Sequence, residues 1–167
     1  AVPSIPVSTL PMPGSVVAIG VGDGDLVNSW VRRLAADLAD TEIVVMGLEA
    51  EYRASLAGAP ANITLQPRLD AEAYWRMFAS LRALIYPYAN SRHIHYVPYE
   101  AIALGIPCLT SESAQVGMDL RSVLGKAKPE EVGLFASPSA AIAGAHTVVR
   151  DAERLQAIAV SQRAVLE

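Results

Sequence analysis

Residues Val16–Gly47 read VVAIGVGDGDLVNSWVRRLAADLADTEIVVMG, a strand, a helix and a second strand in succession. The stretch begins with a short β-branched run that ends in glycines, which is typical of a buried parallel strand. Leu26, Trp30, Leu34 and Leu38 follow at helical spacing, with arginines between them. A second apolar run, Glu42–Gly47, ends the unit. Strands that alternate with helices form right-handed crossovers, so the stretch predicts an α/β protein with a parallel sheet.

The same alternation continues along the rest of the chain. Further runs of strand length are NITLQPRL from Asn62, ALIYPY from Ala83, IPCLTS from Ile106 and GLFAS from Gly133. Helices are expected after Asp70, from Pro98 to Gly105, and over the closing residues, where Asp151 is a possible break. Residues 114–133 show no clear period and are expected to be irregular. We therefore predict a doubly wound, Rossmann-like parallel sheet of five or six strands over residues 15–167.

Residues 1–14 differ from this pattern. They contain four prolines, which indicate an extended linker or a domain boundary rather than a folded element. We expect these residues to lie outside the sheet, and the chain to be one domain of a longer enzyme.

Composition narrows the functional classes. With 17 acidic and 13 basic residues the formal net charge is −4, which argues against a nucleic-acid partner. Cys108 is the only cysteine, so no intramolecular disulfide and no cysteine zinc cluster can form. No pair of metal-binding aspartates is evident, and we expect neither a metal nor a cofactor. A single thiol suits a reducing compartment, so a cytoplasmic location is expected.

The segment Ile63–Ser111 resembles the carboxyl-terminal domain of the GT-B glycosyltransferases. That family has a helix beginning Glu-Ala-Met-Ala-x-Gly-x-Pro-Val, and here Glu100–Cys108 reads EAIALGIPC. The apolar strand before it, ALIYPY, occupies the place of the family's Pro-ended strand. By specific residue the likeness covers about a dozen positions, and by topology it extends from Ser15 to the end.

The resemblance implies that Glu100 accepts hydrogen bonds from the ribose hydroxyls of a nucleotide. A carboxylate in the first turn of a helix is favoured by the helix dipole, and its oxygens can bind a diol. Arg68 lies where the family reads the base. Glu112 and Asp119 lie near where it contacts the sugar or diphosphate. The candidate substrate-binding residues are Glu100, Arg92, His93, His95, Gly22, Arg68 and Tyr99.

Two departures from the family concern the phosphates. Retaining members have a second glutamate where this chain has Arg92, so retention or inversion of the anomeric centre stays open. They also have an Arg and a Lys after the first strand, where this chain has a glycine-rich turn that includes Gly22. Arg92, His93 and His95 are then the cationic candidates for the diphosphate, since arginine can bind phosphate oxygens in bidentate fashion.

The resemblance implies transfer of a sugar from a nucleoside-diphosphate sugar to a polysaccharide or glycolipid acceptor. The partners expected are the donor, an amino-terminal domain of the same enzyme and, for the whole enzyme, the inner face of a membrane by peripheral association. The isolated domain is expected to be inactive. Two alternatives stay open, one half of a nucleotide-sugar 2-epimerase and a non-catalytic Rossmann-like or receiver-like binding module.

Overall fold

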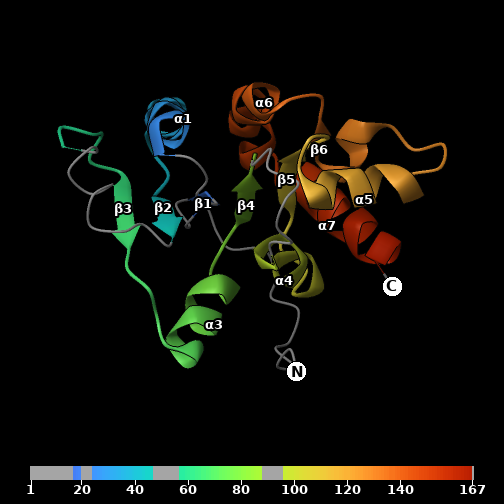
Figure 1. Cartoon of the computed structure of the whole chain (residues 1–167), viewed down its shortest axis with the longest axis horizontal. Helices are drawn as coiled ribbons and strands as arrows, with labels where there is room; N and C mark the ends of the chain where they lie inside the picture. Colours follow the sequence, from blue (N-terminus) through green and yellow to red (C-terminus); the bar gives the residue numbers. More distant parts are fainter. Residues whose placement is uncertain (1–16, 20–23, 47–56, 88–95, 167) are drawn as a thin grey trace.

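The computed structural model describes residues 17–19, 24–46, 57–87 and 96–166 (Figure 1). The strands form one sheet in the order β3-β2-β1-β4-β5-β6, and every pair is parallel. Their bounds are β1 Val17–Ile19, β2 Ile43–Met46, β3 Ile63–Gln66, β4 Ala83–Tyr86, β5 Cys108–Ser111 and β6 Leu134–Phe135. The predicted doubly wound parallel sheet of five or six strands is confirmed. Residues 1–14 lie outside the described residues.

The helices connect these strands in the predicted alternation. They are α1 Gly24–Asp37, α3 Ala71–Ala79, α4 Val97–Ala103, α5 Gln115–Val123, α6 Pro138–Arg150 and α7 Ala152–Leu166, with a 3-10 turn η1 at Pro129–Val132. The break at Asp151 is confirmed. The expectation that residues 114–133 are irregular is wrong, because α5 lies there. Its buried residues, Val116, Gly117 and Leu120, include a glycine, and this dilutes the apolar period in the sequence.

Two hydrophobic cores cover the two faces of the sheet. Along β4, Ala83 and Ile85 pack in the core formed with α1 and α6, whereas Leu84 and Tyr86 pack in the core formed with α3, α4 and α5. This alternation follows from the pleat of a strand, which points successive side chains to opposite faces. In Figure 1, α1 and α6 lie above the sheet and α3 and α4 below it.

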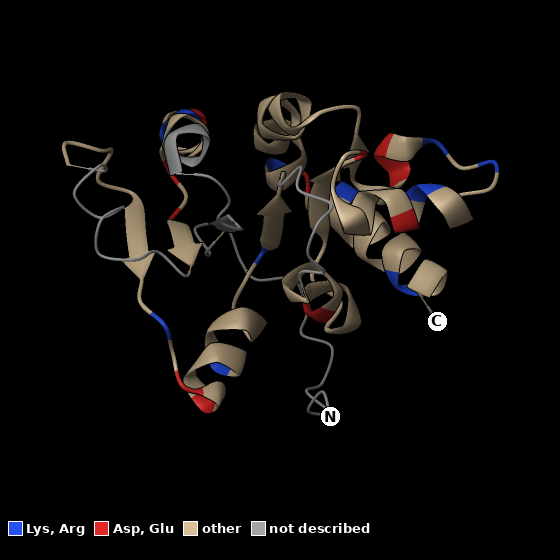
Figure 2. Cartoon of the chain, viewed as in Figure 1, with Lys and Arg blue, Asp and Glu red and all other residues tan. Residues whose placement is uncertain are grey.

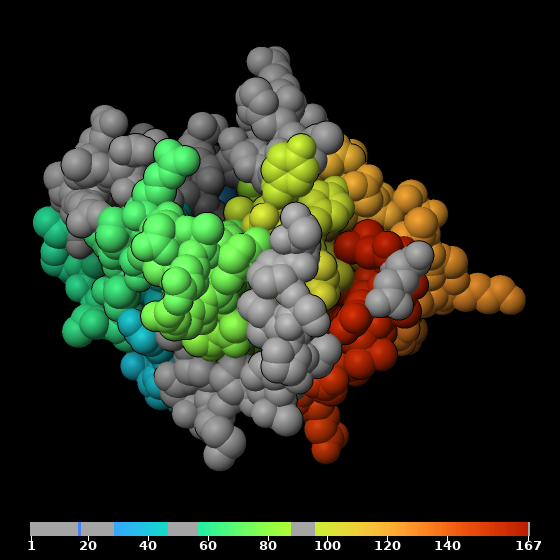
Figure 3. Space-filling view, turned by 90° about the horizontal axis from the view of Figure 1, so that it is seen from below, coloured from blue at the N-terminus to red at the C-terminus, as the bar shows by residue number. Residues whose placement is uncertain are grey.

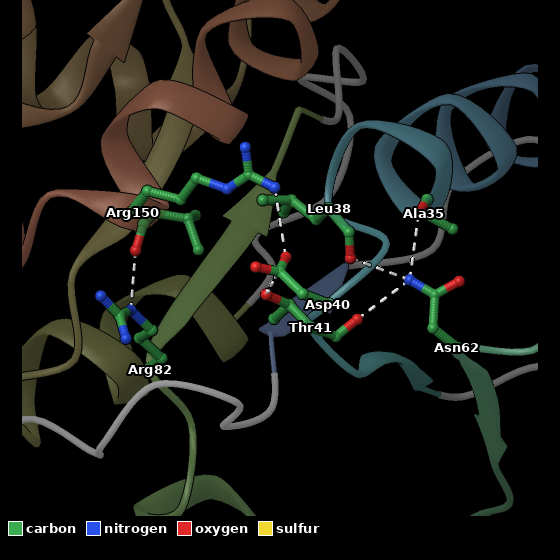
Figure 4. A network of polar contacts seen from close by, with 8 residues as sticks. Ala35, Leu38, Asp40, Thr41, Asn62, Arg82 and Arg150 are labelled. Carbon is green, nitrogen blue, oxygen red and sulfur yellow. Dashed lines mark hydrogen bonds and ion pairs between the residues drawn. The ribbon is translucent and has the colours of Figure 1, made fainter.

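The Asn62 side chain caps the carboxyl end of α1, at the edge of the sheet opposite the carboxyl ends of the strands. Its side-chain Nδ2 lies 3.0 Å from each of the carbonyl oxygens of Ala35, Leu38 and Thr41 (Figure 4). The last carbonyls of a helix have no partner within the helix, so a side-chain amide that donates to them stabilises the helix end.

The carboxyl end of α6 is closed by a cation. Arg82 is 8% exposed, and its Nε donates to the carbonyl oxygen of Val149 at 2.7 Å. A positive charge at this end is favoured by the helix dipole. Nearby, Arg150 and Asp40 form an exposed ion pair at 3.2 Å between α6 and the end of α1 (Figure 4).

The side chain of Gln162 makes hydrogen bonds to the start of β5, where β6 is too short to pair with it. Gln162 on α7 is fully buried, and its Oε1 accepts from the backbone N–H of Cys108 at 2.9 Å. Its Nε2 donates to the carbonyl oxygens of Cys108, at 2.6 Å, and Val132, at 2.8 Å. Because β6 begins only at Leu134, the amide of Gln162 takes the place of a strand beside Cys108.

Replacing Gln162 by leucine should destabilise the protein strongly. Leucine fills a similar volume but leaves three buried backbone groups without these hydrogen bonds, and each such group costs about 1–3 kcal/mol. Urea unfolding followed by circular dichroism measures the change, with an expected loss of about 3 kcal/mol or more. Gln156→Leu, at an exposed position of the same helix, is the control. Equal stability of the two variants would contradict the role of Gln162.

Candidate functional site

The order of the strands locates the site. The chain winds outward in opposite directions from β1 and β4, which are neighbours in the middle of the sheet. In doubly wound sheets, ligands bind at the carboxyl ends of the strands, at this point of reversal. The loops that follow β1 and β4, residues 20–23 and 88–95, lie outside the described residues. The described part of this edge includes the starts of α1, α3, α4 and α5.

Glu100 lies in the first turn of α4, as the sequence predicts. Pro98 occupies an early position of the helix, and Gly105, with φ of 76°, follows its end. Ala101 and Ile102 are buried and fasten α4 to the sheet. The Glu100 side chain is half-buried, so its carboxylate is held by the protein and also reaches the surface.

Tyr74 on α3 holds the Glu100 carboxylate. Its hydroxyl donates to Glu100 Oε2 at 2.6 Å, across 26 residues of sequence. The Tyr74 ring stacks on Phe78, with ring centroids 5.0 Å apart, and meets the edge of Trp75 at 5.2 Å. The sequence predicts Tyr74 and Phe78 on one helix face but contains no signal that pairs Tyr74 with Glu100.

The electrostatics of this pair keep the phenol protonated. Burial raises the pKa of Tyr74, and the hydrogen bond and negative charge of Glu100 raise it further. A neutral phenol can donate only while it keeps its proton, so the raised pKa preserves the hydrogen bond well into alkaline solution.

Tyr99 makes a similar bond on the other flank of α4. Its hydroxyl donates to the carboxylate of Asp119 on α5, which also accepts from Gln115 Nε2 at 3.0 Å. The side chain of this sequence candidate is therefore engaged with α5, and Tyr99 and Glu100 contact different neighbouring helices. Glu112 lies 3.8 Å from Arg121 in an exposed ion pair.

The start of α5 fits closely onto the end of β5. A Cβ atom on Gly117 would lie 1.9 Å from the carbonyl oxygen of Ser111, so glycine is required at this contact. The buried Ser111 hydroxyl lies 2.8 Å from that of Ser113 and 3.3 Å from the Pro87 carbonyl oxygen. Among the described residues no side chain caps α5, whose N-cap is Ala114. The first N–H groups of an uncapped helix can bind an anion.

The remaining sequence candidates are placed as follows. Arg68 is exposed between β3 and α3. Arg92, His93, His95 and Gly22 lie outside the described residues. Within the described ranges, no group of three or more His, Cys, Asp or Glu side chains could hold a metal ion. Cys108 is buried, and burial raises the pKa of its thiol, so it is no nucleophile.

Other surface features lie away from this edge. Charged side chains of both signs are scattered over the described helices (Figure 2). A hollow of about 360 Å³ between η1 and α7 is lined by Lys128, Glu130, Glu131, Arg154 and Ser161, among others. It lies near the amino end of β6, away from the strand ends where such sheets bind ligands. None of the described helices is long and apolar enough to span a bilayer.

Solved structures share this fold over nearly the whole chain. A mutant of the Thermobaculum terrenum O-GlcNAc transferase is 15% identical, with a TM-score of 0.69, and the match covers 98% of this chain and 34% of that one. A mutant of S. aureus TarM in complex with fondaparinux, alpha-GlcNAc-glycerol and UDP is 8% identical, with a TM-score of 0.72, over 97% of this chain and 34% of that one. The chain therefore has the same Rossmann-like fold as one domain of each of these proteins.

Enzymes other than transferases share this fold. The UDP-GlcNAc 2-epimerase from Neisseria meningitidis bound to UDP-GlcNAc is 13% identical, with a TM-score of 0.64, over 88% of this chain and 39% of the epimerase. The chain spans about a third of the length of the first structures it matches. No protein-family model and no curated sequence matches it.

Stability in alkaline solution tests the raised pKa values of the Cys108 thiol and the Tyr74 phenol. The pKa values of Cys108 and Tyr74 are raised above their unfolded values of 9.0 and 10.0, so the unfolded chain releases these protons first. The stability that they contribute is complete below pH 9 and is lost as the pH rises above it. Cys108→Ala should flatten the fall from pH 9 to 10, and Tyr74→Phe the fall above pH 10.

Urea unfolding at half-unit steps from pH 7.5 to 11 gives these slopes. The readout is the slope of the unfolding free energy against pH. Its absolute value is not used, because each substitution also changes packing. For Tyr74 the effect should be below one full proton, since the residue is only half-buried and water partly screens the interaction with Glu100. Slopes identical to those of the wild type in both variants would contradict the assignment.

Proposed function

We propose that this domain binds a nucleoside-diphosphate sugar at the carboxyl edge of its sheet. It would serve as the donor half of a glycosyltransferase that moves the sugar to a polysaccharide or glycolipid acceptor. The observation that carries the proposal is Glu100, a half-buried carboxylate in the first turn of α4, held at Oε2 by Tyr74. The GT-B resemblance implies that this residue accepts hydrogen bonds from ribose hydroxyls.

The chemistry of the carboxylate suits a ribose. An ionised carboxylate only accepts hydrogen bonds, and its two oxygens offer about four acceptor sites. Tyr74 uses one of these on Oε2. The remaining sites can accept from neighbouring hydroxyls, and hydrogen bonds to a charged group are stronger than those between neutral groups.

The diphosphate would lie at the start of α5. Its N–H groups follow directly on β5, and Gly117 lets the backbone of this turn approach the end of the strand. A helix start favours negative charge by its dipole and its free donors. Arg92, His93 and His95 would supply cations from the loop before α4, and Gly22 would allow close approach after β1. Arg68 would lie toward the base, beyond β3.

Catalysis would need the rest of the enzyme. The acceptor site and the general base belong to an amino-terminal domain in this proposal, and closure of two domains around the donor completes such sites. The helix start and cations would stabilise the charge that develops on the leaving diphosphate. The domain alone should therefore bind a nucleoside diphosphate weakly and transfer no sugar.

A nucleotide-sugar 2-epimerase half is the second candidate. The fold shared with the Neisseria meningitidis enzyme supports this candidate as much as the transferase structures support a transferase. Incubating the full-length enzyme with UDP-GlcNAc and no acceptor separates the two. Isomerised nucleotide sugar would support the epimerase, and dependence on an acceptor would support the transferase.

Replacing Glu100 by glutamine should weaken nucleotide binding about tenfold or more. The substitution keeps the shape but removes the charge, and hydrogen bonds to a charged group are worth about 1.5–3 kcal/mol. Fold stability should change by only about 0.3–1 kcal/mol, the value of a charge near a helix dipole. Titration calorimetry with UDP, GDP and ADP, chosen from a thermal-shift panel, measures the affinity.

The matched control is Glu72→Gln. Glu72 is also an acidic residue in the first turn of a helix, but it is exposed on α3 and pairs with Arg76. It should leave nucleotide affinity unchanged. Equal affinities in wild type and Glu100→Gln would remove the ribose role of Glu100 and the main support for the proposed function.

A further inference from the structure

The first turn of α4 is held on both flanks by hydrogen bonds between a phenol and a carboxylate. On one flank Tyr74 of α3 donates to Glu100, and on the other Tyr99 of α4 donates to Asp119 of α5. Figure 3 shows α3 and α4, in light green and yellow-green, on one face of the molecule. The two bonds are chemically alike, but only the first involves Glu100, the carboxylate proposed to bind the ribose.

We propose that Tyr74 is a positioning residue that orients the Glu100 carboxylate and thereby sets the preference of the site for ribose over deoxyribose. By holding Oε2, it leaves Oε1 without a described side-chain donor and in a fixed direction. This inference rests on the proposed function, because it acts through the contact between Glu100 and the ribose.

Tyr74 is itself held rigidly, as a positioning residue must be. Its ring lies between stacking contact with Phe78 and edge contact with Trp75. The turn that bears it is capped by Asp70, whose Oδ1 accepts from the N–H of Ala73 at 2.9 Å. The backbone N–H of Tyr74 also bonds the carbonyl oxygen of Asp70, at 2.9 Å. The hydroxyl is therefore a fixed donor.

A fixed donor matters because glutamate is flexible. Its side chain has three rotatable bonds, and a carboxylate that must be ordered by the ligand binds less tightly than one already ordered by the protein. Supporting hydrogen bonds that lock a contacting side chain are the usual means of this preorganisation. Without the phenol, Glu100 keeps its charge but loses its fixed direction.

The test compares Tyr74→Phe with Asn62→Ala. Each removes side-chain hydrogen bonds and should lower stability, but Asn62 donates to backbone carbonyl oxygens at the end of α1, at the edge opposite the proposed nucleotide site. The affinities of UDP and 2′,3′-dideoxy-UDP are measured by titration calorimetry for wild type, both variants and Glu100→Gln, with the GDP and ADP pairs in parallel. The ratio of the two affinities reports the ribose contact. If Tyr74 only stabilised the fold, its substitution would leave this ratio unchanged.

We expect the wild type to prefer UDP by about tenfold or more, the worth of one hydrogen bond to a charged group. Glu100→Gln and Tyr74→Phe should lose most of this preference, and Asn62→Ala should keep it. A Tyr74→Phe variant that keeps the preference lost by Glu100→Gln would overturn the positioning role alone. Loss of the preference in Asn62→Ala as well would also overturn it, because the loss would then follow from lower stability. No preference in the wild type would overturn the proposed function and this inference together.

Discussion

The burial of β4 and β5 on both faces is the constraint from which the rest of the structure follows. Every residue of these two strands is buried, so helices must cover the sheet on both sides. Their apolar side chains alternate between two cores, one with α1 and α6 and one with α3, α4 and α5. Because α3 and α4 share a core, Tyr74 and Glu100 meet although 26 residues separate them. The candidate site is a consequence of how the sheet is covered.

Local signals in the sequence predict most of the fold. Apolar runs and helical spacing predict the parallel strands, and single residues mark boundaries, as Asp70 does for α3 and Asp151 for the break between α6 and α7. The pattern fails at α5, where Gly117 is present for a close contact with β5 and interrupts the apolar period. The apolar pattern also does not reveal Gln162. This polar residue is buried because it bonds the backbone of Cys108, which is distant in the sequence.

The candidate site is less predictable because its contacts join separate helices. The family resemblance marks Glu100, and the structure agrees that it lies at the start of α4. It does not mark Tyr74, since a tyrosine in an aromatic helix face is equally expected from packing. The anion-binding potential of α5 was also hidden, because the helix itself was not predicted. Neither Tyr74 nor the start of α5 could be assigned to the site from the sequence, because only the tertiary structure shows what lies beside them.

The most direct test of the account is to map where a nucleotide binds. Titrating the ¹⁵N-labelled chain with UDP, and following the backbone amides by NMR, locates the contact residue by residue. Binding at the carboxyl edge predicts the largest shifts at Glu100 and at the start of α5, around Gln115 and Gly117. Shifts concentrated between η1 and α7 instead, or none at millimolar UDP, would contradict the account.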